Sequence, residues 1–261
     1  MTAFPLFALS LAILQSAPAT APASPIDARA AECLQIAADD PVSAITTASS
    51  WLGEGATLGA TYAHECLGHA YVRLLRWEAA EEEFLAAREN ETGDPARRAR
   101  LAAMAGNAAL AESRASDALV SLDAAREEAA AAGDPELAAQ VEIDRARALV
   151  ELGRPEPAAD ALTAARESQP QNAEAWLLSA TLARRMERIG EAQAMIETAA
   201  ALTPRDVQVA LEAGVIAALG GRDDAARRNW EAVVEIAADE ASVETAKAYL
   251  AQLDGEQEAA R

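Results

Sequence analysis

A series of alanines recurs along this chain at the spacing of a helical hairpin. Five of them follow one another at intervals of 38, 40, 34 and 34 residues: Ala80, Ala118, Ala158, Ala192 and Ala226. Units of this length hold two helices and a turn, and an alanine near the start of each second helix lets the two helices approach closely. The recurrence therefore predicts stacked helix pairs, each packed mainly on its neighbours.

Two segments show the repeat most clearly. One contains Leu67, Gly68, Tyr71, Ala80, Phe84 and Ala87, and the other contains Trp176, Ala192, Ile196, Ala199 and Pro204. Both resemble the tetratricopeptide repeat, whose pattern has a Trp, a Leu-Gly pair, a Tyr, a later Ala, an aromatic residue and a closing Pro. The resemblance implies an all-α fold, a right-handed α-solenoid of stacked antiparallel helix pairs with a C-terminal capping helix.

The repeat divides the chain into an array and its flanks. The array is expected at 61–253, with helix pairs in units 61–94, 95–134, 135–172, 173–206 and 207–238, and a capping helix at 239–253. A degenerate N-terminal pair is expected at 24–60, because terminal repeats of such arrays depart from the pattern. A disordered tail is expected at 254–261.

The first two intervals between these alanines exceed 34 residues, and the inserts that lengthen them end in the same tripeptide. Gly93-Asp94-Pro95 and Gly133-Asp134-Pro135 lie 40 residues apart. In each, we expect Gly to close one helix in the left-handed conformation, Asp to cap the next helix and Pro to begin it. The inserts are thus predicted to lengthen helices without breaking the array. Turns within pairs are expected at Leu75-Arg76, Ser113-Arg114, Gly153-Arg154-Pro155, Ile189-Gly190 and Gly220-Gly221-Arg222.

The charge composition argues against some partners. The chain has 42 acidic and 22 basic residues, a formal net charge of -20, and no block of Lys or Arg. Proteins that bind nucleic acid or anionic lipid present concentrated positive charge. Neither class of partner is therefore expected.

The first residues have the pattern of a secretory signal peptide. An apolar run from Phe4 to Leu14 precedes two small-x-small motifs, which end at Ala19 and Ala23. Such a run followed by such a site is typical of cleavable export signals, and the run is too short to span a membrane. We expect 1–23 to be a signal peptide and the mature protein to be periplasmic or secreted from a bacterium. The amino-terminal side of the run has no Lys or Arg, so a cytoplasmic protein with an Ala/Pro-rich start is the alternative.

The only two cysteines, Cys33 and Cys66, bear on the same question. An even number of cysteines in an exported chain favours a disulfide. The alternative is a pair of buried free thiols.

No combination of residues predicts catalysis, a metal site or a cofactor. The two histidines, His64 and His69, are five positions apart, which turns one about 140° from the other around a helix. A zinc protease needs them four apart on one face. Because both histidines lie in this segment, no Ser-His-Asp or Cys-His arrangement is expected elsewhere, and the protein is predicted not to be an enzyme.

The family resemblance implies a concave groove lined by the first helix of each pair. Helical spacing places a mildly basic strip there, opposed by Glu65, Glu151 and Glu174. The candidate binding residues are Tyr62, His69, Arg73, Arg100, Asn107, Arg147, Arg184 and Arg185. Family members that clamp a C-terminal carboxylate use a Lys and two Asn. Only Asn107 resembles that set, which argues against that type of partner.

The resulting hypothesis is an adaptor of the bacterial cell envelope that binds a partner segment in the groove. The alternative is a structural or self-associating subunit of an envelope complex that uses the convex face. The sequence identifies neither the partner protein nor the oligomeric state.

Overall fold

The computed structural model describes residues 24–55 and 57–259, and these residues are helical apart from short connections. The predicted signal peptide lies outside them. The helices are α1 (Pro25–Asp39), α2 (Pro41–Gly53), α3 (Thr57–Arg73), α4 (Trp77–Asn90), α5 (Pro95–Ala111), α6 (Ala115–Ala132), α7 (Pro135–Glu151), α8 (Pro155–Ser168), α9 (Ala173–Arg185), α10 (Ile189–Leu202), α11 (Val207–Leu219), α12 (Asp223–Ile236) and α13 (Glu240–Ala259).

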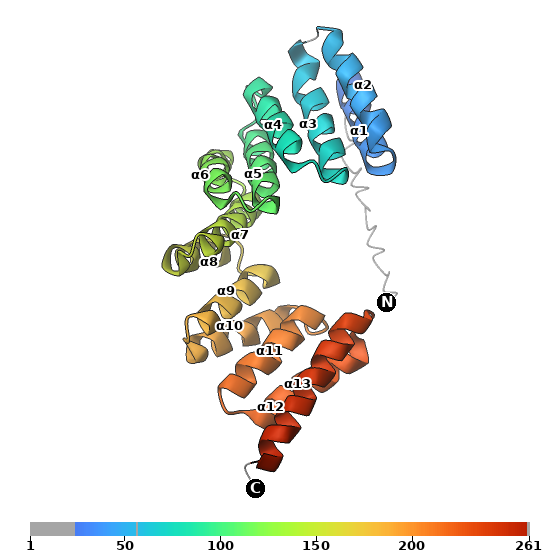
Figure 1. Ribbon diagram of the computed structural model, residues 1–261. Helices are drawn as coiled ribbons and strands as arrows, with labels where there is room; N and C mark the ends of the chain where they lie inside the picture. Colours follow the sequence, from blue (N-terminus) through green and yellow to red (C-terminus); the bar gives the residue numbers. More distant parts are fainter. Residues whose placement is uncertain (1–23, 56, 260–261) are drawn as a thin grey trace, which may run out of the picture.

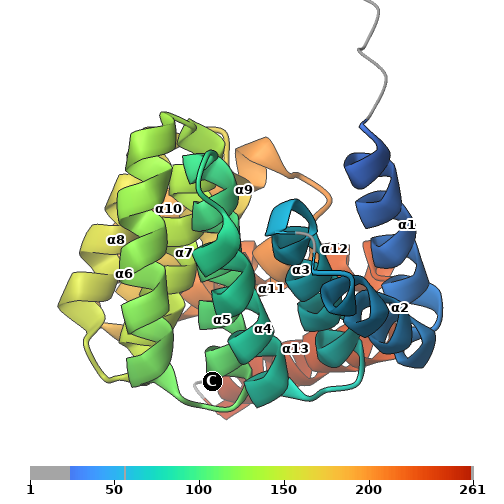
Figure 2. The same ribbon diagram turned by 90° about the horizontal axis from the view of Figure 1, so that it is seen from above.

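These helices pack as successive pairs, so the predicted all-α solenoid is confirmed. Each helix contacts the next one along the chain, and α5 also contacts α7, as α9 does α11. The stack follows a curve, and its two ends, α1 and α13, come round to the same side (Figure 1). Seen from above, α6 and α8 lie on the opposite side from α1 (Figure 2). A curved stack of this kind has a concave and a convex face.

One contact recurs in every pair between α3 and α12. A small residue in the first helix faces a large one sixteen positions later in the second helix. The pairs are Gly68 with Phe84, Gly106 with Leu122, Ala146 with Leu162, Ala180 with Ile196, and Gly214 with Trp230. A Cβ atom on Gly68 would lie 2.5 Å from Phe84 Cε1, and one on Gly214 would lie 2.5 Å from Trp230 Cδ1. The aromatic side chains thus occupy the space that a glycine leaves open within their own pair, and not only the gap between neighbouring units.

The five repeating alanines lie beside these contacts. Ala80, Ala118, Ala158, Ala192 and Ala226 are all fully buried, at 0 % exposure. Alanine buries little apolar area, but it lets backbones come close enough for dense packing. The five alanines therefore mark the close helix–helix contact that their spacing predicts.

The turns inside the pairs share a backbone conformation. In the five pairs from α3 to α12, the residue two positions before the second helix has a positive φ, and the arginine that follows it donates its backbone N–H to a carbonyl five residues back. The positive-φ residues are Leu75, Ser113, Gly153, Glu187 and Gly221. This is the Schellman ending of a helix, which satisfies the last carbonyls. The turn predicted at Ile189-Gly190 in fact lies at Glu187–Arg188, because α10 already begins at Ile189.

The Gly-Asp-Pro inserts behave as predicted in one case and differ in the other. Asp94 and Asp134 both cap the following helix, and Pro95 and Pro135 begin it. Gly133 closes α6 in the left-handed conformation, with a φ of 66°. Gly93 does not have a positive φ, because α4 has already ended at Asn90 and Gly93 donates its N–H to the Glu91 side chain.

The C-terminal helix is longer than predicted. α13 continues to Ala259, through the first part of the segment for which a disordered tail was predicted. Asp254 and Gly255 disfavour a helix, but the residues that follow them are Glu, Gln and Ala, which favour one, and no proline is present. Asp254 also pairs with Arg227 of α12, at 2.5 Å, which holds this turn against the preceding pair.

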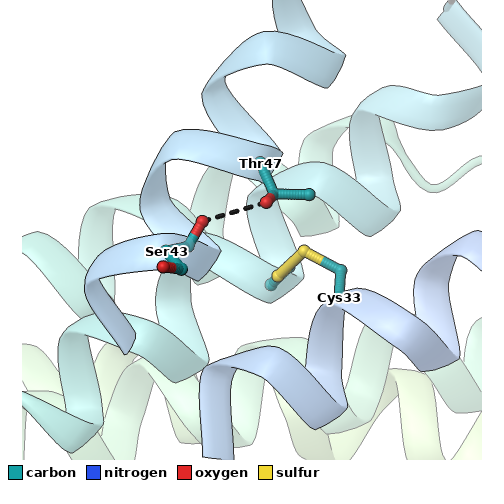
Figure 3. Close-up of a disulfide and its surroundings, with 4 residues drawn as sticks. Cys33, Ser43 and Thr47 are labelled. Atoms are coloured by element: carbon teal, nitrogen blue, oxygen red, sulfur yellow. Dashed lines mark hydrogen bonds between the residues drawn. A yellow bond between two sulfur atoms is a disulfide. The ribbon is translucent and has the colours of Figure 1, made fainter. Parts of the chain in front are cut away.

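A disulfide joins the N-terminal pair to the array. It links Cys33 of α1 to Cys66 of α3, and both residues are buried. In Figure 3 the bond lies beside α2, near Ser43 and Thr47. The Thr47 hydroxyl donates a hydrogen bond to the Ser43 carbonyl at 2.9 Å. The alternative of two free thiols is therefore not what the structure contains. Disulfides of this kind persist in oxidising compartments.

We predict that removing the disulfide loosens the N-terminal pair selectively. The Cys33→Ala, Cys66→Ala double variant loses a crosslink that spans 33 positions, which corresponds to about 3–4 kcal/mol in the chain-entropy account. Hydrogen exchange should rise in α1 and α2 and stay unchanged in α9 to α12, because repeat arrays open locally. Equal protection of α1 in the variant and the oxidised protein would contradict this expectation.

We predict that Gly214→Ala destabilises the array, whereas Gly190→Ala does not. The added methyl at position 214 would overlap Trp230, while nothing lies within 4 Å of a Cβ at position 190. Overpacking of this kind costs about 1–3 kcal/mol. Thermal unfolding followed by circular dichroism measures the difference. If the two variants unfold at the same temperature, the close contact between Gly214 and Trp230 is not needed for stability.

Candidate functional site: the concave groove

Two adjoining hollows lie against α9 in the C-terminal half. A cavity of about 540 Å³ is bordered by α9, α11 and α13, and one of about 220 Å³ by α7, α8 and α9. Leu178, Thr181 and Arg185 line both. The two cavities therefore form one groove that crosses α9, and we refer to it as the α9 groove.

The capping helix contributes one wall of this groove. Ala241, Ser242, Thr245 and Tyr249 of α13 border the larger cavity. Tyr249 also packs on Trp230, with ring centroids 5.0 Å apart. Ala246 and Leu253 on the same helix are buried, as an amphipathic cap requires. The sequence indicates a cap here but does not show that α13 takes the place of a further first helix.

Three of the predicted groove residues come together in the α9 groove. Arg147 lines the smaller cavity, Arg184 the larger one and Arg185 both. Arg184 is held by Glu212 of α11, with Nε 2.7 Å from the carboxylate. Arg147 is held by Asp144, at 2.5 Å, and also by Glu174 of α9. The Arg185 side chain is exposed and makes no ion pair in the part of the chain that the structure describes.

A buried carboxylate organises the junction of α5 and α7. Asp144 is 2 % exposed and accepts hydrogen bonds from Asn107 of α5, at 3.0 Å, and from Arg147. Burial raises the pKa of Asp144, and the hydrogen bonds from Asn107 and Arg147 oppose that rise. The amide of Asn107, predicted to face a ligand, is thus engaged within the array. Asp144 was not predicted, because a single Asp in a helical repeat carries no signal of burial.

The remaining predicted residues lie elsewhere. Tyr62 donates its hydroxyl to Asp27 of α1, at 3.0 Å, and Arg97 lies over its ring. Arg100 is exposed, 3.9 Å from Asp94, and Arg73 is exposed at the end of α3. None of the three lines the α9 groove. The helix α1 packs on α3 and occupies part of the face on which Tyr62 was expected to be free.

The two histidines make separate contacts. His64 Nδ1 lies 2.6 Å from a Glu83 oxygen, and His69 packs edge-on against Phe84, with ring centroids 5.4 Å apart. Burial lowers the pKa of His69, and the charge of Glu65 opposes this. Within residues 24–55 and 57–259, no cluster of three or more His, Cys, Asp or Glu residues is arranged to hold a metal ion. In the same residues, no helix is both long and apolar enough to cross a membrane.

Comparison with proteins of known structure identifies the fold. No family pattern and no curated protein matches the sequence. Among solved structures, one described as PilF of Pseudomonas aeruginosa superposes with a TM-score of 0.65 at 15% identity, covering 85% of this chain and 98% of that one. A tetratricopeptide repeat protein from Parabacteroides merdae gives 0.60 at 17% identity, covering 75% and 74%. YrrB, described as a TPR protein with an unusual peptide-binding site, gives 0.52 at 19% identity, covering 71% and 90%. The chain therefore has the fold of a tetratricopeptide-repeat solenoid.

Proposed function

We propose that this protein is a non-catalytic adaptor that binds a segment of another protein in the α9 groove. The observation that carries the proposal is the groove itself, which joins two cavities across α9 and presents Arg185, a side chain with no ion pair to any residue of 24–55 or 57–259. A rigid solenoid offers such a surface with little ordering cost on binding.

The likeness to other solenoids supports the same kind of function. YrrB, described as a TPR protein with an unusual peptide-binding site, shares this fold. Known proteins with this fold thus include at least one that takes peptides. We place the site in this chain from the cavities of its own structure.

We also propose that the adaptor works in the bacterial cell envelope. Two independent features support export: the signal-peptide pattern of residues 1–23 and the disulfide between Cys33 and Cys66. Cytosolic thiols are kept reduced, so a buried structural disulfide fits an exported protein better.

For the groove, we predict that a photocrosslinker inserted at Thr181 captures a partner in the native cells, whereas one at Val120 does not. Thr181 lines both cavities, and Val120 is 72 % exposed on α6. Neither side chain is buried, so both variants should fold. Capture at Val120 alone would contradict groove binding and favour a structural subunit that uses its convex face.

For the compartment, we predict that the protein purified from its native cells begins at residue 20 or 24, after Ala19 or Ala23. Amino-terminal sequencing measures this directly. A native protein that still begins at Met1 would contradict export.

A further inference from the structure

The α7–α9 junction differs from its neighbours at one repeated position. Residues 144, 178 and 212 are 34 positions apart, the spacing of Ala158, Ala192 and Ala226. They therefore occupy equivalent places in α7, α9 and α11. The three residues are Asp144, Leu178 and Glu212.

A junction here is the contact between the first helices of two successive pairs. At two junctions the carboxylate accepts a hydrogen bond from the preceding first helix. Asp144 accepts from Asn107 of α5 at 3.0 Å, and Glu212 accepts from Arg184 of α9 at 2.7 Å. Leu178 cannot accept a hydrogen bond. Between α7 and α9 the ion pair lies one helical turn before Leu178, where Arg147 pairs with Glu174. The helices α7 and α9 also approach each other less closely than α5 and α7 or α9 and α11 do.

The space left at this junction is an apolar pocket. It is the smaller cavity of the α9 groove, with walls from Ala146 and Val150 of α7, Leu162 of α8, and Leu178 and Leu182 of α9. Its volume of about 220 Å³ suits a single large side chain. The guanidinium of Arg147 lies on its border and is fixed there by the buried Asp144.

Arg185 and Arg188 lie at or beside the pocket. Arg185 borders it, and Arg185 and Arg188 both line an adjoining cavity that shares Val150 and Leu182 with it. Neither guanidinium makes an ion pair or hydrogen bond within the described residues. Glu156 also lines the adjoining cavity, so two basic side chains and one acidic side chain border it, in a chain with a net charge of -20.

We propose that this pocket receives a large aliphatic side chain of an internal partner segment, and that Arg185 pairs with a Glu or Asp next to it in that segment. This rests on the proposed function and identifies the chemistry of the bound segment. The ligand carboxylate supplies the acidic partner that Arg185 lacks among the described residues. Apolar burial gives affinity, and the charge-assisted bond gives selectivity for acidic neighbours.

The probes are synthetic peptides of Gly and Ser with a central Glu-Leu-Glu, compared with Gln-Leu-Gln and Glu-Ala-Glu. A fourth peptide ends at the Leu with a free carboxylate and has no acidic side chain. Methyl NMR spectra of the full protein report binding even when it is weak. We expect Glu-Leu-Glu to shift the methyls of Val150, Leu162, Leu178 and Leu182, and to bind about tenfold more tightly than Gln-Leu-Gln.

Three variants test the residues. Arg185→Gln should lower the affinity for Glu-Leu-Glu about tenfold and leave that for Gln-Leu-Gln unchanged. Leu178→Glu should restore the acidic pattern, pair with a guanidinium at the pocket and abolish binding. Arg126→Gln removes the same charge from an exposed position on α6 and should change nothing. Thermal unfolding of each variant shows that the fold is kept.

The inference is wrong if the neutral peptide binds as tightly as the acidic one, if only the peptide with the terminal carboxylate binds, or if none shifts the pocket methyls. Crosslinking at Thr181 separates this from the proposed function. If the Arg185→Gln variant captures a partner there with equal yield, groove binding is supported and recognition of an acidic residue is contradicted.

Discussion

The close approach of the two helices in each pair is the contact on which the rest of this structure depends. A glycine or alanine in the first helix lets a larger side chain from the second sit against its backbone, as Phe84 does over Gly68 and Trp230 over Gly214. Where the small residue is alanine, the facing side chain is the smaller Leu162 or Ile196. Complementary size, repeated along the chain, fixes the geometry of every pair and therefore the curvature of the stack.

Because the pairs are built from one contact, differences between their junctions stand out as local features. The junctions of α5 with α7 and of α9 with α11 are bridged by Asn107–Asp144 and Arg184–Glu212. The α7–α9 junction has Leu178 at the equivalent position, and an open apolar pocket lies there. A site can thus arise in a repeat protein from a single position that departs from the pattern of its neighbours, without any new element of structure.

Much of the fold could be predicted from the sequence, because the repeat is a packing signal. The spacing of five alanines predicts the helix pairs, and the Asp-Pro dipeptides predict where α5 and α7 begin. The prediction was wrong where local backbone choices decide the outcome. Gly93 has no left-handed conformation because α4 ends earlier, and α13 continues through Asp254 and Gly255, where a glycine would be expected to end a helix.

The candidate site was harder to predict, since periodicity indicates on which face of a helix a residue lies but not which residues it contacts. Arg147, Arg184 and Arg185 were placed on the inner face alike, yet two of them are bound to Asp144 and Glu212 and one is not. Tyr62 was placed there too, but the terminal helix α1 covers it through Asp27. What separates a binding residue from a structural one in this array is whether the neighbouring repeat supplies the opposite charge. At the α7–α9 junction Arg185 has no acidic partner among the described residues, and in our proposal the bound segment supplies one.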